Sequence, residues 1–558
     1  MRYSCLIFTA FLLVLFSCKE EKKNEIKHIT VKKIQDANKE ANEILKGYYE
    51  NSIGDTLLVI NNDSLITYSY FKKVYNGKDL LFTDKGKLTA KGDSLFQLVA
   101  KCRTYGLFAG DYHYYTLDSL VTNFYNKGDK TYNVSCLAAF EALLTDAYLK
   151  IGAHLNKGRF NPDTMLLEWN PKKLDTNWTS ILRYGLQSGN FRKAFDSLEP
   201  RHKGYQFLKK AFNNYLAENE KIQWDSISFF NIVDTIALKE EIKQRLIQTG
   251  DYNDSLKAND SIKLAKGIKS FQKRFNLEPD GKLGKYTKQA LGLNKELTIR
   301  QMEMALERWR WEPAKYPDKY AVVNIPSADI HVWEWYKKKK EDTLVFKSRV
   351  VVGKPENQTP ILKSKINYIL IYPYWNVPFS IAWKEILPMV KMDTNYLHKH
   401  NFEVINGRGE VVTNLGKLNW KKFNKENLPV RFRQRIGDEN SLGICKFNFN
   451  SKYDVYMHDT NSKRYFKTFY RYQSHGCIRL EKYMEMARFL IRDDTLKIPY
   501  DTLNAYFIRE KQEKINLRKP LPIYVRYFTA GVDSVQQLQL FLDIYRKDRK
   551  MMEMVYSR

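Results

Sequence analysis

The sequence predicts an α+β protein of several domains: a helical N-terminal scaffold, a small three-helix module, and a β-rich C-terminal domain with an inserted capping subdomain. Its length of 558 residues corresponds to three or four domains at about 150 residues each. Its composition, 43% hydrophobic and 14% aromatic, is sufficient to bury cores. After residue 313 the apolar spacing changes from helical steps to strand alternation.

The N-terminal stretch MRYSCLIFTAFLLVLFSC is typical of a secretion signal. Arg2 precedes an apolar run from Cys5 to Phe16, which is too short to cross a bilayer comfortably as a helix. The stretch LFSC resembles a bacterial lipobox, which implies that residues 1–18 form a lipoprotein signal and that Cys18 is lipidated. Several acyl chains would anchor the protein stably to a membrane. An uncleaved anchor is the alternative, and both place the chain in the cell envelope, in the periplasm.

The net charge of +29 favours acidic partners such as nucleic acid, anionic lipid or a polymer with carboxylates. No nucleic-acid-binding motif is found, so we expect no nucleic-acid partner. The lysines are spread along the chain, as in an ordinary solvated surface.

Four cysteines lie beyond the signal: Cys102, Cys136, Cys445 and Cys477. They are too few for a disulfide framework, although whether Cys102 and Cys136 form a disulfide stays open. No cysteine or histidine spacing suggests a zinc site, and the family resemblance described below implies neither metal nor cofactor.

Residues 19–45 are charged and poor in aromatic residues, which predicts a flexible tether. Residues 46–255 predict a helical scaffold domain. The stretch VSCLAAFEALLTDAYLKIGAHL at 134–155 has apolar residues at three- and four-residue steps, and a second amphipathic stretch ends at Gly250. This region shows no catalytic motif.

Residues 256–300 predict a helical hairpin around the turn PDG. The segment resembles the small three-helix peptidoglycan-binding module. An ordinary hairpin is the alternative, and whether the module binds glycan or only packs stays open. The residues that match the module are Phe271, Gln272, Asp280, Gly281, Gly284 and Thr287.

Residues 301–500 predict a β-rich domain, because YAVVNIPSADIHVWEW, TLVFKSRVVVG and INYILIYPYWNV alternate β-branched or aromatic residues with polar ones. The polar, mixed segment at about 380–440 is expected to be an insertion over this β core. Residues 501–558 are expected to form a C-terminal extension with one strand and a charged helical tail.

His458 and Cys477 lie 19 residues apart and provide the components of nucleophilic catalysis. A cysteine attacks as the thiolate, and an imidazole within reach can take its proton and return it to a leaving amine. Gly476 lets a substrate approach the backbone, and the N–H groups of Gly476 and Cys477 can hold an oxyanion. Tyr456, two residues before His458, would share its face of a strand.

The stretch SHGC, with a histidine 16 residues before its serine, resembles the catalytic signature of the L,D-transpeptidases. Other stretches are similar to the large YcbB-type members with a YkuD catalytic domain: VVNIPSADIHVWE, RVVVGKPENQTP, YPYWNVPFSIAWKEILP, RQRIGDENSLG and YMHDT. The sequence is thus identified as a member of this family, with the resemblance covering about 320–492.

The resemblance implies that Cys477 is the nucleophile and His458 its base, oriented by a backbone carbonyl such as that of Asp459. It also implies that Arg479 supports the loop or binds a substrate carboxylate. Trp375 and Asn376 could line the cleft, although aromatic residues on strands lie more often in the core than in a cleft. The remaining candidates for the pocket, oxyanion hole and cleft are Ser474, His475, Gly476, Tyr456, Trp375 and Asn376.

The reaction implied by the resemblance begins on a peptidoglycan tetrapeptide stem. The thiol takes the acyl group with loss of the terminal D-alanine, and an amine of a neighbouring stem receives it in a 3→3 cross-link. Carbapenems are implied to acylate the same thiol. An L,D-carboxypeptidase, a protein amine as acceptor, and a non-catalytic peptidoglycan-binding lipoprotein remain alternatives. Two departures, Tyr472-Gln473 before the motif and Cys445 where a basic residue is common, concern substrate preference.

Overall fold

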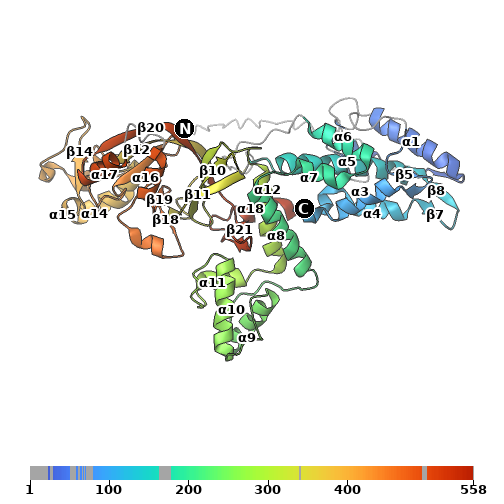
Figure 1. Ribbon diagram of the computed structural model, residues 1–558, viewed down its shortest axis with the longest axis horizontal. Coiled ribbons are helices and arrows are strands. Elements are labelled where there is room, and N and C mark those ends of the chain that lie inside the picture. Colours follow the sequence, from blue (N-terminus) through green and yellow to red (C-terminus); the bar gives the residue numbers. More distant parts are fainter. Residues whose placement is uncertain are drawn as a thin grey trace, which may run out of the picture. The chain divides into compact units, whose positions relative to one another are not determined.

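The computed structural model describes residues 23–24, 29–50, 58–60, 63–65, 67, 70, 79–162, 177–338, 341–492 and 499–556 (Figure 1). The predicted signal, with Cys18, lies outside the described residues. The chain divides into two compact units, Met1–Arg159 with Lys173–Glu199, and Phe160–Lys172 with Pro200–Arg558. Within the described residues no helix combines the length and apolar character that a membrane span requires.

The first unit is built around one buried helix, α5 (Val134–Lys157), which contacts the other long helices of the unit (Figure 1). The Asn133 side chain caps its start by accepting a hydrogen bond from the Cys136 N–H, and Gly158 ends it. The surrounding helices are α1 (Ile34–Glu50), α3 (Ala90–Ala100), η1 (Cys102–Tyr105), η2 (Ala109–Tyr112), α4 (Tyr114–Thr122), α6 (Trp178–Ser188) and α7 (Phe191–Leu198). Short strands complete the unit: β1 (Lys23–Asn24), β2 (Thr30–Val31), β3 (Leu58–Ile60), β4 (Asp63–Leu65), β5 (Thr83–Asp84), β6 (Lys87–Leu88), β7 (Tyr125–Asn126) and β8 (Thr131–Asn133).

The predicted tether is wrong over most of its described length, because α1 begins at Ile34. Ala37, Ala41 and Leu45 repeat at four-residue steps and are buried in the core that α1 shares with α5. Small apolar residues in a charged segment are therefore enough to dock this helix. The two thiols whose pairing was open, Cys102 and Cys136, are both buried, and no disulfide joins them to each other.

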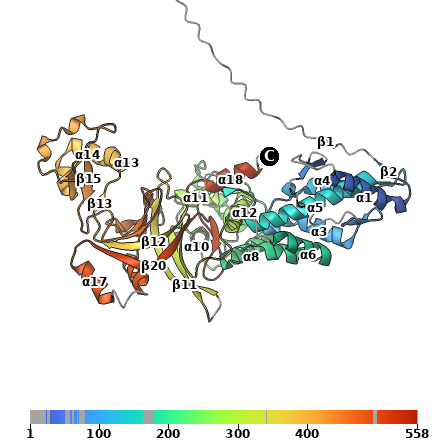
Figure 2. The ribbon, with the colours of Figure 1, turned by 90° about the horizontal axis from the view of Figure 1, so that it is seen from above.

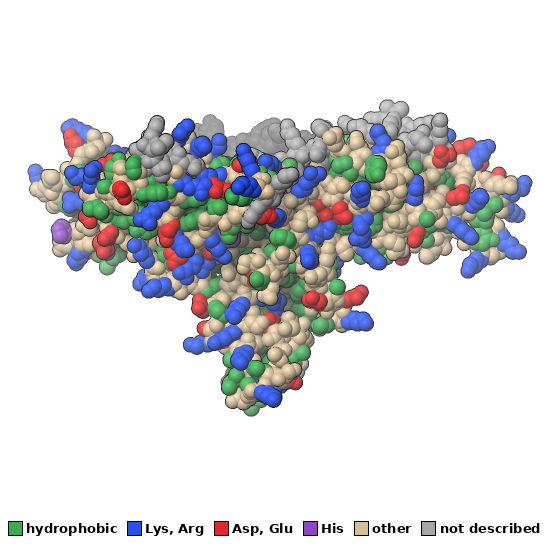
Figure 3. All heavy atoms as spheres, in the orientation of Figure 1, with side chains coloured by type: hydrophobic (Ala, Val, Ile, Leu, Met, Phe, Trp, Pro, Cys, Tyr) green, Lys and Arg blue, Asp and Glu red, His purple; other side chains and the backbone are tan. Residues whose placement is uncertain are grey.

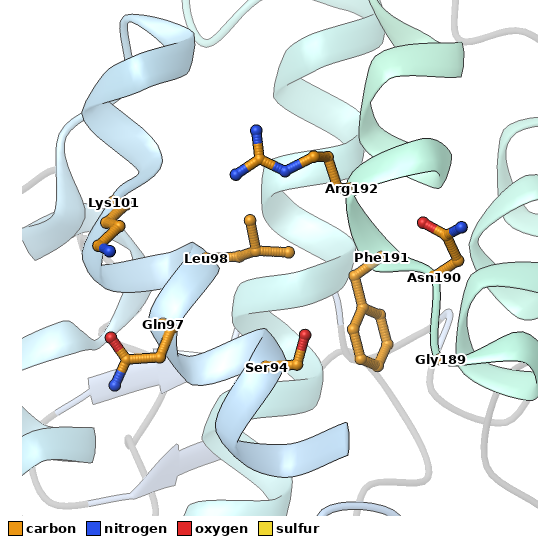
Figure 4. A pocket seen from close by; sticks show the side chains of 8 residues that line it. All are labelled: Ser94, Gln97, Leu98, Lys101, Gly189, Asn190, Phe191 and Arg192. Atoms are coloured by element: carbon orange, nitrogen blue, oxygen red, sulfur yellow. The ribbon is translucent and has the colours of Figure 1, made fainter. Parts of the chain in front are cut away.

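A hollow of about 260 Å³ opens in the first unit beside α3 and the start of α7 (Figure 4). Polar and basic side chains line most of it. None of the predicted catalytic residues belongs to it. Its lining consists of Ser94, Gln97, Leu98, Lys101, Gly189, Asn190, Phe191 and Arg192.

The second unit begins with helices α8 (Lys203–Glu218), α9 (Thr235–Gln248), α10 (Asp260–Arg274), α11 (Lys285–Leu291) and α12 (Lys295–Arg310). The predicted scaffold boundary at residue 255 is therefore wrong, because α8 and α9 pack into the second unit. Their apolar faces share one core with the predicted module and α12. The buried residues of this core include Tyr205, Leu208, Phe212, Ile242, Leu246, Ile268, Phe271, Phe275 and Ile299.

The residues that match the peptidoglycan-binding module stabilise the turn between α10 and α11. The Gln272 amide donates to the Asp280 carboxylate and to the Lys282 carbonyl, both at 2.9 Å. Its carbonyl oxygen accepts from the Gly281 N–H at 2.9 Å. The matching pattern thus records a folding requirement of the turn, which a satisfied buried amide explains without a ligand.

A nine-stranded sheet forms the centre of the second unit, in the order β10-β9-β20-β12-β16-β17-β19-β11-β18. Buried Val, Ile and Phe side chains from its strands form the largest core of the chain. Two helices follow the catalytic motif, α16 (Tyr483–Ile491) and α17 (Tyr500–Ile508). The strands are β9 (Lys319–Asn324), β10 (Asp329–Tyr336), β11 (Glu341–Gly353), β12 (Leu362–Ile371), β16 (Cys445–Phe449), β17 (Met457–His458), β18 (Tyr472–Ser474), β19 (Ile478–Leu480) and β20 (Glu513–Arg526).

The predicted C-terminal extension adds a strand to this sheet, so residues after 500 pack with the strands that precede them. Strand β20 lies between β9 and β12, and alternating residues such as Ile515 and Ile523 are buried. The hairpin β21 (Ala530–Val532) and β22 (Leu538–Leu540) and the helix α18 (Lys547–Tyr556) follow. Arg308 of α12 forms a buried ion pair with Asp548 of α18.

The segment expected as an insertion has a small sheet and a core of its own, between β12 and β16 (Figure 2). Its buried residues include Val377, Val390 and Phe432. Its elements are β13 (Trp375–Asn376), α13 (Phe379–Ile381), η4 (Ala382–Ile386), α14 (Leu387–Met392), α15 (Asn395–Lys399), β14 (Phe402–Ile405), η5 (Leu415–Lys417), η6 (Trp420–Lys422) and β15 (Arg431–Gln434).

Lysine and arginine side chains are scattered over the visible surface of both units (Figure 3). This distribution fits the solvated basic surface that the sequence indicates. The α+β multidomain class and the helical and β-rich regions are confirmed.

Candidate active site

The register of three short strands brings the predicted catalytic residues to one face of the sheet. His458 of β17 is paired with Lys446 of β16 on one side and with Arg479 of β19 on the other. Residues that face each other on neighbouring strands project to the same side, and so do residues two positions apart on one strand. Tyr456 and Cys477 therefore join the face that carries His458.

The Tyr456–Cys477 pair is held by direct contacts. The Ile478 N–H donates to the Tyr456 carbonyl at 3.0 Å, which continues the parallel pairing of β17 with β19. The Cys477 thiol lies close enough to Tyr456 for the phenol and the backbone of Tyr456 to lower the thiol pKa. Tyr456 is thus the immediate neighbour of the thiol on this face.

The loop before Cys477 is a tight turn closed by Ser474. The Ser474 hydroxyl donates to the Cys477 carbonyl at 2.5 Å and accepts from the Gly476 N–H at 3.1 Å. Gly476 has φ +115°, a left-handed conformation that L side chains rarely adopt. Of the two predicted oxyanion donors, the Gly476 N–H is engaged by Ser474, so the Cys477 N–H is the one that stays open.

Thr359 supports this loop through two hydrogen bonds, and no pattern in the sequence distinguishes it as a site residue. Its hydroxyl donates to the Gly476 carbonyl at 2.8 Å and accepts from the Gly353 N–H at 2.8 Å. The Tyr545 phenol donates to the Gly353 carbonyl at 2.6 Å and accepts from the Thr359 N–H at 3.2 Å. Thr359 lies in the stretch GKPENQTP, which carried the resemblance but no assigned role.

His458 is fully buried and its ring is fixed by the backbone. Its Nδ1 donates to the carbonyl of Asp459, the contact that the resemblance implies. Nε2 is then left as the nitrogen that can accept a proton. Burial, helped by the charge of Arg479, lowers the pKa of His458 to about 3. The imidazole is therefore neutral at physiological pH.

The Cys477 thiol is only partly exposed, and burial raises its pKa above the usual value. Tyr456 and the cations of Lys446 and Arg479 oppose this shift. The resting site thus contains a thiol beside a neutral imidazole, and we infer that the thiolate forms together with the attack.

The insertion contributes to the site through Trp375, whose side chain opposes the rise in the pKa of the Tyr456 phenol. The Trp375 ring is half-buried and packs 6.2 Å from the Phe402 ring, within the insertion. The neighbouring candidate Asn376 is exposed and pairs with Arg433 in the small sheet. The structure therefore brings Trp375 to the thiol's neighbour and leaves Asn376 outside this contact network.

Three other predicted site residues, His475, Asp459 and Arg479, have side-chain contacts outside the Tyr456–His458–Cys477 set. His475 is exposed and bonds Glu385 of the insertion at 2.7 Å. The Asp459 carboxylate accepts from the Ile444 N–H at 3.1 Å. The Arg479 guanidinium lies 5.7 Å from the Tyr465 ring centre. Of these residues, Arg479 also acts electrostatically on the thiol and imidazole.

Family models match three parts of the chain. A model described as "Scaffold domain" matches residues 69–212, and one described as "Putative peptidoglycan binding domain" matches residues 239–291. A third, YkuD, described as the L,D-transpeptidase catalytic domain, matches residues 318–498. A Haemophilus influenzae protein named "Putative L,D-transpeptidase" is 31% identical over 233 residues. The match covers 41% of this chain and 44% of that protein, less than half of its length.

Residues 318–498, which hold the site described above, are thus similar to the L,D-transpeptidase catalytic domain of the YkuD family. The regions that match the scaffold and peptidoglycan-binding models precede them in the chain. The predicted resemblance is confirmed for these domains.

The electrostatics predict how Cys477 reacts with iodoacetamide. Because its pKa is raised and His458 is neutral, the thiolate fraction at pH 7 is below that of a free cysteine. The alkylation rate should rise about tenfold per pH unit through pH 8, as measured by peptide mass spectrometry. A rate that levels off between pH 5 and 7 would instead indicate a preformed thiolate–imidazolium pair.

The hydrogen bonds of Thr359 predict a local effect of Thr359→Val. The change leaves the Gly476 carbonyl and the buried Gly353 N–H without their partner, at a cost of about 2 kcal/mol. Hydrogen exchange of residues 474–478 should become about tenfold faster or more. Thr413→Val, at an exposed threonine of the insertion, is the matched control. Unchanged exchange in the Thr359 variant would show that this contact does not hold the loop.

Proposed function

We propose that this protein is an L,D-transpeptidase that acylates Cys477 with a peptidoglycan tetrapeptide stem and forms 3→3 cross-links. The observation that supports it most is the shared face of Tyr456, His458 and Cys477, with the His458 ring fixed by the Asp459 carbonyl. Such a set provides a nucleophile, a proton carrier and an oxyanion donor within one strand register.

In the first half-reaction the Cys477 sulfur attacks the carbonyl of the third stem residue. The thiol proton passes to Nε2 of His458 as the carbon–sulfur bond forms. The Cys477 N–H and the Tyr456 phenol donate to the oxyanion. The bond to the terminal D-alanine then breaks, and its amine takes the proton from His458. Because the pKa of His458 is lowered to about 3, its imidazolium gives up this proton readily.

In the second half-reaction an amine of a neighbouring stem attacks the thioester. His458 takes the proton from the amine and returns it to the departing Cys477 sulfur. The new amide is the 3→3 cross-link. Water in place of the amine would give an L,D-carboxypeptidase with the same residues in the same roles. The identity of the acceptor can therefore be read from the product of the reaction.

The setting of this reaction is the cell wall outside the cytoplasm. We propose lipidation of Cys18 as the membrane anchor, in the periplasm, on the resemblance of LFSC to a lipobox. The peptidoglycan-binding domain and the net charge of +29 suit an acidic wall polymer as partner. We extend the proposed acylation of Cys477 to carbapenems, whose strained carbonyl offers the thiol an equivalent target.

Incubation with a purified disaccharide-tetrapeptide tests the proposal. We expect the unaltered protein to release D-alanine and to yield 3→3 dimers by mass spectrometry, and Cys477→Ala to yield neither. Cys445→Ala is the control, because that thiol is buried on the opposite face of β16 from Lys446 and should be dispensable. Undiminished dimers from Cys477→Ala would refute the proposal, while tripeptides without dimers would identify a carboxypeptidase.

A further inference from the structure

Lys446 brings a positive charge to the catalytic face, and the sequence analysis did not single it out. It is paired with His458 in the register of β16 and β17. Its ammonium lies 3.7 Å from the ring centre of Tyr456, which is the immediate neighbour of the Cys477 thiol. The cation and the reacting sulfur therefore lie beside the same aromatic side chain.

The acidic side chain that acts on the charge of Lys446 among the described residues is the exposed Asp454, and no ion pair joins the two. The Lys446 side chain is half-buried, and burial lowers its pKa. Two fully buried arginines of this unit do have carboxylate partners, Arg526 with Glu312 and Arg308 with Asp548. Because an unpaired, partly desolvated cation is costly, its presence here points to an anion that arrives with a ligand.

We propose that Lys446 binds the terminal carboxylate of the donor stem and so selects donors that end one residue after the scissile bond. This inference rests on the proposed transpeptidase function. In such a donor the carboxylate belongs to the leaving D-alanine and lies about 4 Å from the carbonyl that Cys477 attacks. An ammonium across the Tyr456 ring is placed to reach it.

Arg479, the residue first considered for a substrate carboxylate, is placed differently. It borders His458 from the β19 side, its guanidinium faces the Tyr465 ring, and its Nε is buried without a hydrogen-bond partner. Its charge acts mainly on His458 and the thiol. Lys446 lies on the opposite, β16 side of His458, beside Tyr456.

The competing role for Lys446 is stabilisation of the Cys477 thiolate, since its charge opposes the rise in the thiol pKa. That role would serve every donor equally. Carboxylate binding serves only donors with a free terminal carboxylate. The ratio of kcat/KM between a carboxylate donor and its amide therefore separates the two.

The experiment compares two tetrapeptide donors, one ending in D-alanine and one in D-alanine amide. For Lys446→Met we expect kcat/KM on the carboxylate donor to fall about tenfold to hundredfold more than on the amide, mostly through KM. Lys446→Arg should restore most of the preference. Lys514→Met is the control, because Lys514 is exposed and its ammonium lies 4.4 Å from the Tyr368 ring centre.

An equal loss on both donors, or no loss, would overturn this inference while leaving the proposed function in place. Unaltered protein that acts on neither donor would overturn both. Binding provides a second measurement should Lys446→Met fail to fold. By calorimetry, Cys477→Ala protein should bind the carboxylate donor about tenfold more tightly than the amide, and equal affinities would contradict the inference.

Discussion

The candidate site depends above all on the strand register of β16, β17 and β19. One row across these strands holds Lys446, His458 and Arg479, and the next holds Tyr456 and Cys477. Because strand side chains alternate, a shift of one residue would turn the imidazole toward the core and leave the thiol without it. The buried residues between them, Met457 and Ile478, oppose that shift since they would become exposed.

The rest of the second unit maintains this register and the loop beside it. Gly476 keeps its left-handed turn through Ser474 in the motif and Thr359 from another loop. Tyr545, from the end of the chain, fixes Thr359 in turn. The insertion adds Trp375 on the phenol of Tyr456 and Glu385 on His475. Residues from four separate parts of the chain thus converge on a few side chains.

The sequence predicted the parts of the site that are local. His458 and Tyr456 share a strand face, and SHGC is one turn, so their arrangement follows from alternation and from glycine. Thr359 and Tyr545 were not predicted because their partners lie about 120 and 190 residues away, and a threonine in a turn-rich loop carries no distinguishing signal. The helix at residues 34–50 was missed because alanines give little periodic contrast.

In the proposed mechanism, the imidazole of His458 and the thiol of Cys477 are both uncharged before the substrate binds. The buried imidazole and the buried thiol both favour their uncharged forms, so charge develops only as the substrate is attacked. Tyr456, Lys446 and Arg479 then surround the place where negative charge appears. The terminal carboxylate of the donor stem would add a negative charge next to the positive charges of Lys446 and Arg479.

The most direct test is intact mass spectrometry of the protein quenched during turnover of the tetrapeptide donor, followed by mapping of the modified peptide. The account predicts an adduct equal to the donor less D-alanine, on Cys477 alone, that disappears when an acceptor amine is added. Turnover with an adduct on another residue, or without any adduct under conditions that trap thioesters, would contradict it.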